Sequence, residues 1–132
     1  MAPSKKRSSL VGSWRLACLE EPGADGRMRR SDCSGQLVLT SDGRISGHIM
    51  YWETPPGSDT DPVQYAQNGY IASYGVYEID ERARTLTHRV DGALVRSLIG
   101  RRLSRTYELK GDQLILRPTD PAEHWTITWE RC

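Results

Sequence analysis

The sequence predicts an all-β domain: an antiparallel up-and-down β-barrel of eight to ten strands with one short helix near a barrel mouth. Apolar and polar residues alternate with a period of two along most of the chain, which is typical of half-buried strands. Short turns that contain Gly and Asp, at 41–44 and 110–112, join successive segments as in hairpins. With this many strands, closure into a barrel removes exposed edges. A β-sandwich is the alternative.

The alternating segments give nine expected strands in order along the chain. They cover residues 10–19, 35–40, 45–52, 71–79, 85–90, 94–99, 101–109, 113–116 and 124–131, of which 94–99 has the weakest pattern. The long stretch at 20–34 is polar and Gly-rich, so we expect a loop there. One helix is expected at 61–68, where Asp61 can cap the first turn, Pro62 fits it, and Asn68 precedes a terminating glycine.

The chain has 132 residues, which suits one domain and is short for two. Residues 1–8 are polar and basic, and we expect a disordered tail ahead of a single domain at 9–132. No apolar stretch of the signal-peptide kind follows the tail. The three cysteines are odd in number and lack metal-site spacing, which favours a reducing cytoplasm. Cys18 shares strand parity with Trp14 and Leu16, which predicts a buried, inert thiol.

Eighteen basic and 17 acidic residues give a formal net charge of +1. Nucleic-acid binding normally needs a clear basic excess, so we do not expect nucleic acid as the main partner. The apolar runs are far shorter than the roughly 20 residues of a membrane-spanning helix, so we expect no membrane association. A monomer or weak homodimer is expected.

The two ends of the predicted barrel carry matching motifs. The first strand contains Gly12-Ser13-Trp14 and the last contains Trp129-Glu130-Arg131. A G-x-W motif with an arginine near the end of the last strand resembles the calycin signature of lipocalins. This resemblance implies that Arg131 lies across Trp14 and closes one barrel end. A guanidinium over an indole is worth about 0.5 to 2 kcal/mol, depending on how far it is desolvated.

Further motifs follow an order shown by a wider family. The segments LVGSWRL, TSDGRISGHI, GYIASYGVYEID, TLTHRVDG and YELKGDQLIL resemble, in this order, the bacterial and fungal lipocalin-like domain family. The similarity extends over nearly everything after the tail, and RPTDPAEHW departs from it in the last hairpin. The resemblance implies a lipocalin-like barrel. A barrel of this size is wide enough to hold one small ligand.

Two polar residues fall within otherwise apolar inward sets, His88 and Arg105. A buried arginine is costly unless it is paired or hydrated. In a structural interpretation, the two residues form a hydrogen-bond network with Tyr74 or Tyr77, whose strand has an ambiguous inward face. In a catalytic interpretation, His88 transfers a proton, Arg105 stabilises a carboxylate, enolate or carbonyl oxygen, and Tyr74 shares that role.

All aromatic side chains are Tyr or Trp, because phenylalanine is absent. Each carries a polar group that needs a partner when buried, which suits a mostly apolar ligand with a few oxygens. The expected ligand-binding residues are Tyr51, Tyr77, Tyr107 and Trp125, with Trp52 at the rim. We expect no metal, because His48 and His124 lie outside the inward sets and no carboxylate cluster accompanies them. No nucleotide or cofactor fingerprint occurs, so we expect no cofactor.

These features favour a cofactor-independent acid–base isomerase or cyclase that binds a small, largely apolar metabolite. A barrel can hold a flexible chain in a reactive geometry, where orientation supplies much of the rate. The Arg-, Ala- and Gly-rich composition is typical of a high-GC bacterium, in which natural-product biosynthesis uses such barrels. The alternative is a carrier or sequestering protein with the same pocket and no chemistry.

Overall fold

The computed structural model describes residues 9–52 and 69–132. Within these ranges the chain forms nine strands and one turn of 3-10 helix, η1. Their bounds are β1 (Gly12–Pro22), β2 (Met28–Arg30), β3 (Cys33–Leu39), β4 (Arg44–Tyr51), β5 (Tyr70–Asp80), β6 (Thr85–Ala93), η1 (Arg96–Leu98), β7 (Arg102–Lys110), β8 (Gln113–Pro118) and β9 (Thr126–Arg131). The all-β prediction is confirmed. The tail expected at 1–8 and the helix expected at 61–68 lie outside the described residues.

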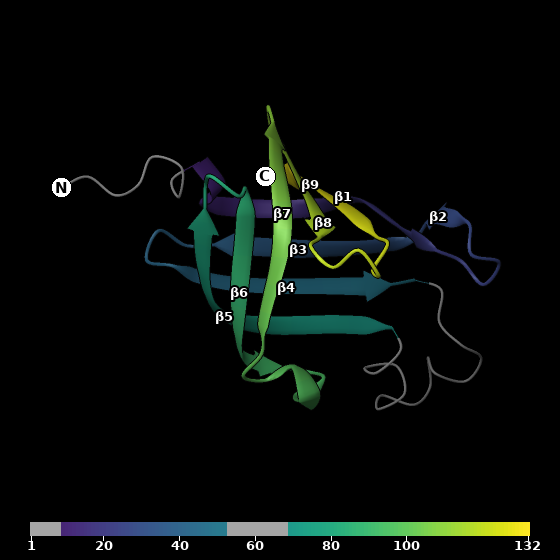
Figure 1. Ribbon diagram of the computed structural model, residues 1–132, viewed down its shortest axis with the longest axis horizontal. Coiled ribbons are helices and arrows are strands. Elements are labelled where there is room, and N and C mark those ends of the chain that lie inside the picture. The colour runs from purple at the N-terminus through teal and green to yellow at the C-terminus, as the bar shows by residue number, and fades with distance from the viewer. Residues whose placement is uncertain (1–8, 53–68) are drawn as a thin grey trace.

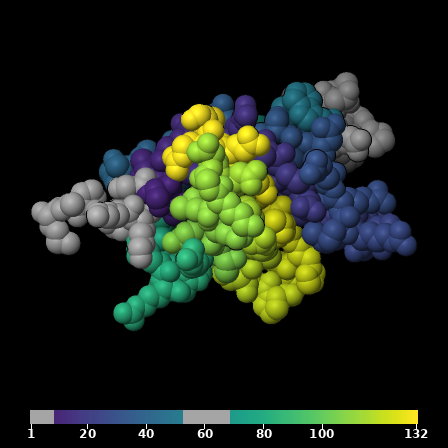
Figure 2. All heavy atoms as spheres, turned by 90° about the horizontal axis from the view of Figure 1, so that it is seen from above, coloured from purple at the N-terminus to yellow at the C-terminus, as the bar shows by residue number. Residues whose placement is uncertain are grey.

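The strands form a closed antiparallel barrel. From β3 to β9 each strand pairs with the next one along the chain, and β1 pairs with both β3 and β9. Eight strands therefore close the barrel, while the short β2 pairs only with the C-terminal end of β1. β3, β4 and the first part of β5 run across the view in Figure 1, while the end of β5 rises steeply beside β6, and β6 and β7 cross in front at a steep angle. Figure 2 shows the yellow C-terminal residues beside purple β1 residues, as the β1–β9 pairing requires.

One end of the barrel is closed by the two motifs from the chain ends. The Arg131 guanidinium carbon lies 4.2 Å from the centroid of the Trp14 ring, and Arg131 Nη1 donates to the Val11 carbonyl at 2.9 Å. Trp14 is fully buried and its Nε1 donates to the Leu10 carbonyl at 3.0 Å. Gly12 has a φ of 140°, and a Cβ there would lie 2.8 Å from Arg131 Nη1. The glycine of the G-x-W motif is therefore required for two reasons: its φ is positive, and Arg131 leaves no room for a Cβ.

The core extends from this closed end along the barrel interior. Buried side chains from all eight barrel strands pack there: Trp14, Leu37, Leu39, Ile45, Tyr77, Leu86, Tyr107, Leu114, Leu116, Ile127 and Trp129. The opposite half of the barrel, which we call the distal half, is formed by the C-terminal ends of β1, β4, β6 and β8 and the N-terminal ends of β3, β5, β7 and β9, whose inward residues include Glu21, Tyr51 and Arg105. Several of these inward residues are polar, and they form the candidate site.

Two register shifts change which residues point inward. In β1 the pairing with β9 shifts between Leu16 and Cys18, so that Cys18 lies opposite Thr128 and Leu19 opposite the buried Ile127. The expectation that Cys18 shares the inward face of Trp14 and Leu16 is therefore wrong. A bulge contributes one extra residue and reverses the alternation beyond it. The second shift lies opposite Tyr74 and Gly75, where Asp91 is the extra residue on β6, so the alternation changes in β6 beyond Val90 and not in β5.

The weak strand predicted at 94–99 does not form. β6 ends at Ala93, and the chain turns back through η1 to β7. Hydrogen bonds from the Leu98 amide to the Val95 carbonyl and from the Ile99 amide to the Arg96 carbonyl make this segment a tight turn. Its apolar residues are largely exposed, so their period-two pattern does not report burial. The last strand also begins later than expected, at Thr126 instead of His124.

Candidate functional site

His88 points into the barrel. It is 8% exposed and lies between Leu86 and Val90 on β6, both of which are buried. Its cross-strand partners are Tyr77 on β5 and Leu103 on β7. The period-two pattern of this strand therefore has the same inward face that the sequence indicated.

The imidazole of His88 is held in its neutral form. Burial and the positive charge of Arg105 lower its pKa from the ordinary value of 6.5, against a smaller opposing effect of a hydrogen bond to the backbone of Tyr74 and the charge of Asp91. His88 Nε2 and Trp129 Nε1 are the two buried side-chain polar atoms without a hydrogen-bond partner within 9–52 and 69–132. Such atoms are rare in folded proteins, and each calls for a partner such as water or a ligand.

Arg105 lies on β7 directly opposite Leu86, one inward position along the strand from Leu103, the partner of His88. Its guanidinium carbon is 5.5 Å from the centroid of the Trp125 ring. Burial lowers the pKa of Arg105, and the negative charge of Glu123 opposes this effect. No carboxylate among the described residues forms an ion pair with Arg105. Its N–H donors can therefore be offered to a ligand oxygen in the distal half.

Glu21 is a functional candidate that the sequence pattern missed. It shares the parity of the buried Leu19, beyond the bulge in β1, and its Oε2 accepts a hydrogen bond from Ser31 Oγ at 2.5 Å and from the Tyr51 phenol at 3.1 Å. Burial and the charge of Glu21 raise the pKa of Tyr51 well above its usual value. The nearby Cys33, opposite Tyr51 on β3, has a pKa raised to about 11 by burial and by Glu21. The polar, Gly-rich composition of residues 20–34 predicted a loop there, whereas β1 continues through Glu21 to Pro22.

The aromatic residues expected to bind a ligand divide into three groups. Tyr51 and Trp125 are partly buried beside the core in the distal half. Tyr77 and Tyr107 belong to the packed core, and the Tyr77 phenol donates to the Thr40 carbonyl at 2.6 Å. Trp52 follows the end of β4 and is 59% exposed.

Tyr74 requires a correction. Its side chain is 59% exposed and pairs with Ser46 on the outer face of the barrel, because Gly75 and Tyr77 occupy the inward positions of β5. It reaches His88 through its backbone alone, so its phenol cannot share a charge inside the barrel. The sequence could not settle the inward face of this strand, since apolar residues occur on both faces.

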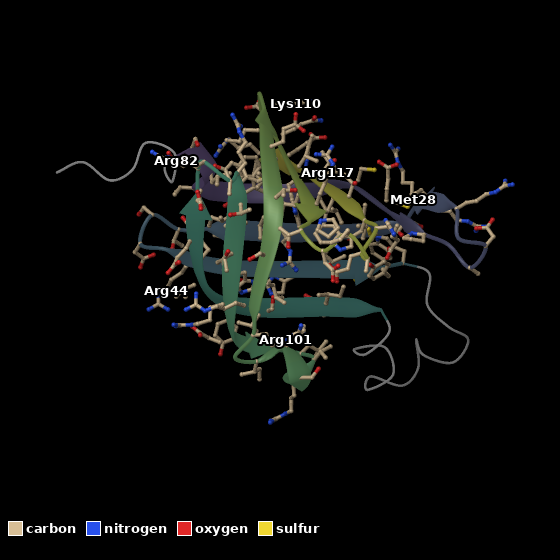
Figure 3. All side chains as sticks on the ribbon, in the orientation of Figure 1. Met28, Arg44, Arg82, Arg101, Lys110 and Arg117 are labelled. Atoms are coloured by element: carbon tan, nitrogen blue, oxygen red, sulfur yellow. The ribbon has the colours of Figure 1, made fainter. Side chains whose placement is uncertain are left out.

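Other site classes find no support among the described residues. No group of three or more His, Cys, Asp or Glu side chains there could hold a metal ion. No helix within them is long and apolar enough to cross a membrane. The labelled basic side chains in Figure 3, including Arg44, Arg82, Lys110 and Arg117, lie around the periphery of the barrel.

Comparisons with known proteins place the chain in one family. None of the curated proteins matches the chain. Among solved structures, two mutants of the fluorescent protein UnaG are similar, with TM-scores of 0.45 and 0.44 and sequence identities of 11% and 12%. In both cases the alignment covers 95% of this chain and 97% of the other. The lipocalin-like domain family matches residues 11–132, nearly the whole chain. The protein therefore belongs to the lipocalin-like domain family.

Proposed function

We propose that the barrel binds a small, largely apolar metabolite in its distal half and acts on it as a cofactor-independent acid–base isomerase or cyclase. The observation that carries this proposal is the pairing of a neutral, buried His88, whose Nε2 has no partner among the described residues, with the nearby guanidinium of Arg105. An inward base beside an inward cation matches the requirements for removing a proton next to a carbonyl group.

The proposed chemistry is a proton shift. His88 Nε2 takes a proton from the carbon next to the ligand's carbonyl, and the electron pair of the broken C–H bond forms an enolate. The enolate oxygen carries the negative charge, and Arg105 donates hydrogen bonds to it. In a ligand with a C=C bond β,γ to the carbonyl, the enolate is a dienolate, and the imidazolium then returns the proton to its γ carbon, so that the product is the conjugated isomer and the histidine is again neutral.

A second set of groups would hold the other end of the ligand. The Glu21 carboxylate accepts hydrogen bonds from the hydroxyl groups of Ser31 and Tyr51, and no cation among the described residues forms an ion pair with it. Its carboxylate can accept a further hydrogen bond from a ligand hydroxyl or amine. Trp125 supplies an apolar surface beneath Arg105. The ligand favoured by these groups has an apolar body, one electronegative oxygen and one hydrogen-bond donor.

A carrier function is the second candidate, and one observation favours it. The lowered pKa of His88 makes the imidazole a weak base, which limits how readily it accepts a proton. In a carrier, the same residues would bind the ligand without chemistry, and His88 would only accept a hydrogen bond.

Proton exchange into a simple ketone distinguishes the two functions. A methyl octyl ketone is incubated with the protein in heavy water, and deuterium uptake beside the carbonyl is followed by NMR. An enzyme accelerates this uptake over buffer, and His88→Gln lowers the acceleration about 10²- to 10⁴-fold, the usual contribution of one acid–base group. Ketone binding without any acceleration would assign the barrel to a carrier.

The anchoring role of Arg105 needs a matched pair of variants. Arg105→Leu should weaken binding of decanoate more than binding of decanol, because only the carboxylate forms charge-assisted hydrogen bonds. Arg102→Leu is the control, because Arg102 lies on the same strand with its side chain on the outer face. Equal losses for both ligands would mean that Arg105 serves only to maintain the barrel.

A further inference from the structure

A hollow lies on the outer face of the barrel, on the other side of the sheet from the distal interior. It has a volume of about 430 Å³ and lies between β4, β5, β6 and the loop that contains η1. Its lining residues are Ser46, His48, Ala72, Ser73, Tyr74, Asp91, Gly92, Ala93, Leu94, Arg96 and Ile99. The volume falls within the range of small-molecule sites.

The floor of the hollow depends on a glycine and an aromatic ring. Tyr74 and Gly92 are cross-strand partners beside the register shift of β5 and β6, and a Cβ at position 92 would overlap the Tyr74 ring. The absence of a side chain at Gly92 lets this ring lie against β6. Bulges of this kind often re-aim side chains beside functional sites.

The wall of the hollow is the loop after β6, and hydrogen bonds fix it at both ends. The Leu94 amide donates to the Ala72 carbonyl at 3.0 Å, and the Gly100 amide donates to the Val90 carbonyl at 2.8 Å. The loop therefore stands over β5 and β6 as a defined wall. In Figure 1 this segment projects at the lower end of the strands.

The lining combines exposed apolar surface with an unpaired cation. Tyr74, Leu94 and Ile99 are among the most exposed large hydrophobic side chains of the described residues. Exposed apolar surface in a concave setting is typical of a binding site. Asp91 is paired with Arg89 at 3.3 Å, whereas Arg96 forms no ion pair within the described ranges. The free charge of the lining is therefore positive.

A row of arginines lies beside the hollow, and one of them, Arg102, forms no ion pair with the described residues. Arg44, Val76, Arg89 and Arg102 are successive cross-strand partners on β4, β5, β6 and β7. Arg89 and Arg102 are thus directly opposite each other, an arrangement of like charges that destabilises a sheet. Arg44 and Arg89 each have one exposed carboxylate partner, whereas Arg102 has none among the described residues. Glu78 on β5 lines a small hollow with Arg89 and Arg102, so one carboxylate already lies close to this pair.

We propose that this outer hollow is a second ligand site, which binds a small aromatic anion. The ring of the ligand lies against Tyr74, Leu94 and Ile99, and its carboxylate, sulfonate or phosphate group contacts Arg96. This site does not depend on the chemistry of the barrel interior. It gives the exposed Tyr74 side chain a role on the outer face.

Naphthoate is the probe, and the two-dimensional amide spectrum of the full chain is the measurement. Naphthoate should shift the amide signals of residues 92–96 in a saturable way, and neutral naphthylmethanol should bind more weakly. Arg96→Gln should weaken naphthoate binding about two- to fivefold, the range expected for an exposed ion pair. Arg101→Gln removes the same charge from the same loop outside the lining, and it should leave the affinity unchanged.

Three results would overturn the proposal. The first is equal naphthoate affinity in Arg96→Gln and the wild type. The second is equal binding of naphthoate and naphthylmethanol, because the charge would then have no role. The third is a titration in which the indole signals of Trp125 and Trp129 move while the amides of 92–96 do not, which would place the probe inside the barrel. This last result would leave the function proposed for the interior intact.

Discussion

Arg131 stacks on Trp14 and also binds the chain segment that precedes it. The guanidinium carbon lies 4.2 Å from the Trp14 ring centroid, and its two terminal nitrogens donate to the carbonyls of Val11 at 2.9 Å and Ser9 at 2.6 Å. The last strand is thereby joined to the residues that lead into the first one. Because Trp14 is fully buried, Trp14→Ala should lower the free energy of unfolding by about 3 to 5 kcal/mol in urea denaturation. A loss below about 1 kcal/mol would contradict its place in the core.

Arg131→Lys tests the planar guanidinium itself. Lysine keeps the charge but cannot stack on the indole and reach both carbonyls at once, so we predict a loss of about 1 to 3 kcal/mol in the free energy of unfolding. Arg15→Lys is the control, because Arg15 forms an exposed ion pair with Glu130 and should contribute little. If the two variants are equally stable, charge alone explains the role of Arg131.

The thiol of Cys33 should be unusually unreactive. Burial and the charge of Glu21 raise its pKa to about 11 from 9.0, so at pH 8 it carries about a hundredfold less thiolate than an ordinary cysteine. Alkylation by iodoacetamide, followed site by site in mass spectra, should therefore be much slower at Cys33 than at the exposed Cys132.

Glu21→Gln should speed the alkylation of Cys33, because it removes the negative charge that opposes thiolate formation. The increase should be partial, since burial is the larger cause of the raised pKa. Glu20→Gln removes the same charge from the exposed neighbouring position and should leave the rate unchanged. If both variants react like the wild type, Glu21 does not face Cys33 inside the barrel.

His88 should make the protein less stable in mild acid. Its pKa in the folded state is lowered from 6.5, so below pH 6.5 the unfolded chain binds more protons at this residue than the folded chain does. Stability should then rise with pH up to about 6.5 and be lost as pH falls toward the lower folded pKa. The melting temperature, measured from pH 7.5 down to pH 5, should show this slope.

The variant His88→Gln should reduce that slope, because glutamine does not titrate. The matched variant His48→Gln removes a histidine from the outer face and should keep the slope of the wild type. An unchanged pH dependence in His88→Gln would mean that the imidazole titrates normally and is not held neutral by burial.

The sequence was sufficient for features that depend on an uninterrupted period of two. The strand around His88 has no bulge before Val90, so counting alternate residues correctly predicts that His88 is buried. The closure by Trp14 and Arg131 could be predicted from the resemblance of their motifs. These features need only local alternation and a short motif at each chain end.

Bulges explain most of what the sequence could not predict. A single extra residue in β1 places Glu21 inside and Cys18 outside, and no local pattern marks that residue. In β5 the alternation is unbroken, but apolar side chains occur on both faces, so the pattern could not tell which of Tyr74 and Tyr77 points inward. The prediction of a strand at 94–99 was wrong for another reason. The apolar residues of this segment line the outer hollow or are exposed, so their alternation does not mark a buried strand face.

Indole N–H signals test the proposed interior site most directly. The chain has four tryptophans, so four such signals are expected, and a Trp→Phe variant at each position assigns them. Trp129 Nε1 has no partner among the described residues, and Trp125 lies beneath Arg105. Trp14 Nε1 is already bonded to Leu10 at the closed end. Decanoate held at Arg105 would therefore act on the Trp125 signal, and its ten-carbon chain, extended along the barrel interior, would reach toward the Trp129 indole in the core.

The measurement is a titration of the labelled protein with decanoate, repeated in Arg105→Gln and Arg102→Gln. We predict saturable shifts of the Trp125 and Trp129 indole signals, a nearly fixed Trp14 signal, and weaker binding in Arg105→Gln alone. Unmoved Trp125 and Trp129 signals, or equal affinity in Arg105→Gln and Arg102→Gln, would contradict a ligand site anchored by Arg105 inside the barrel.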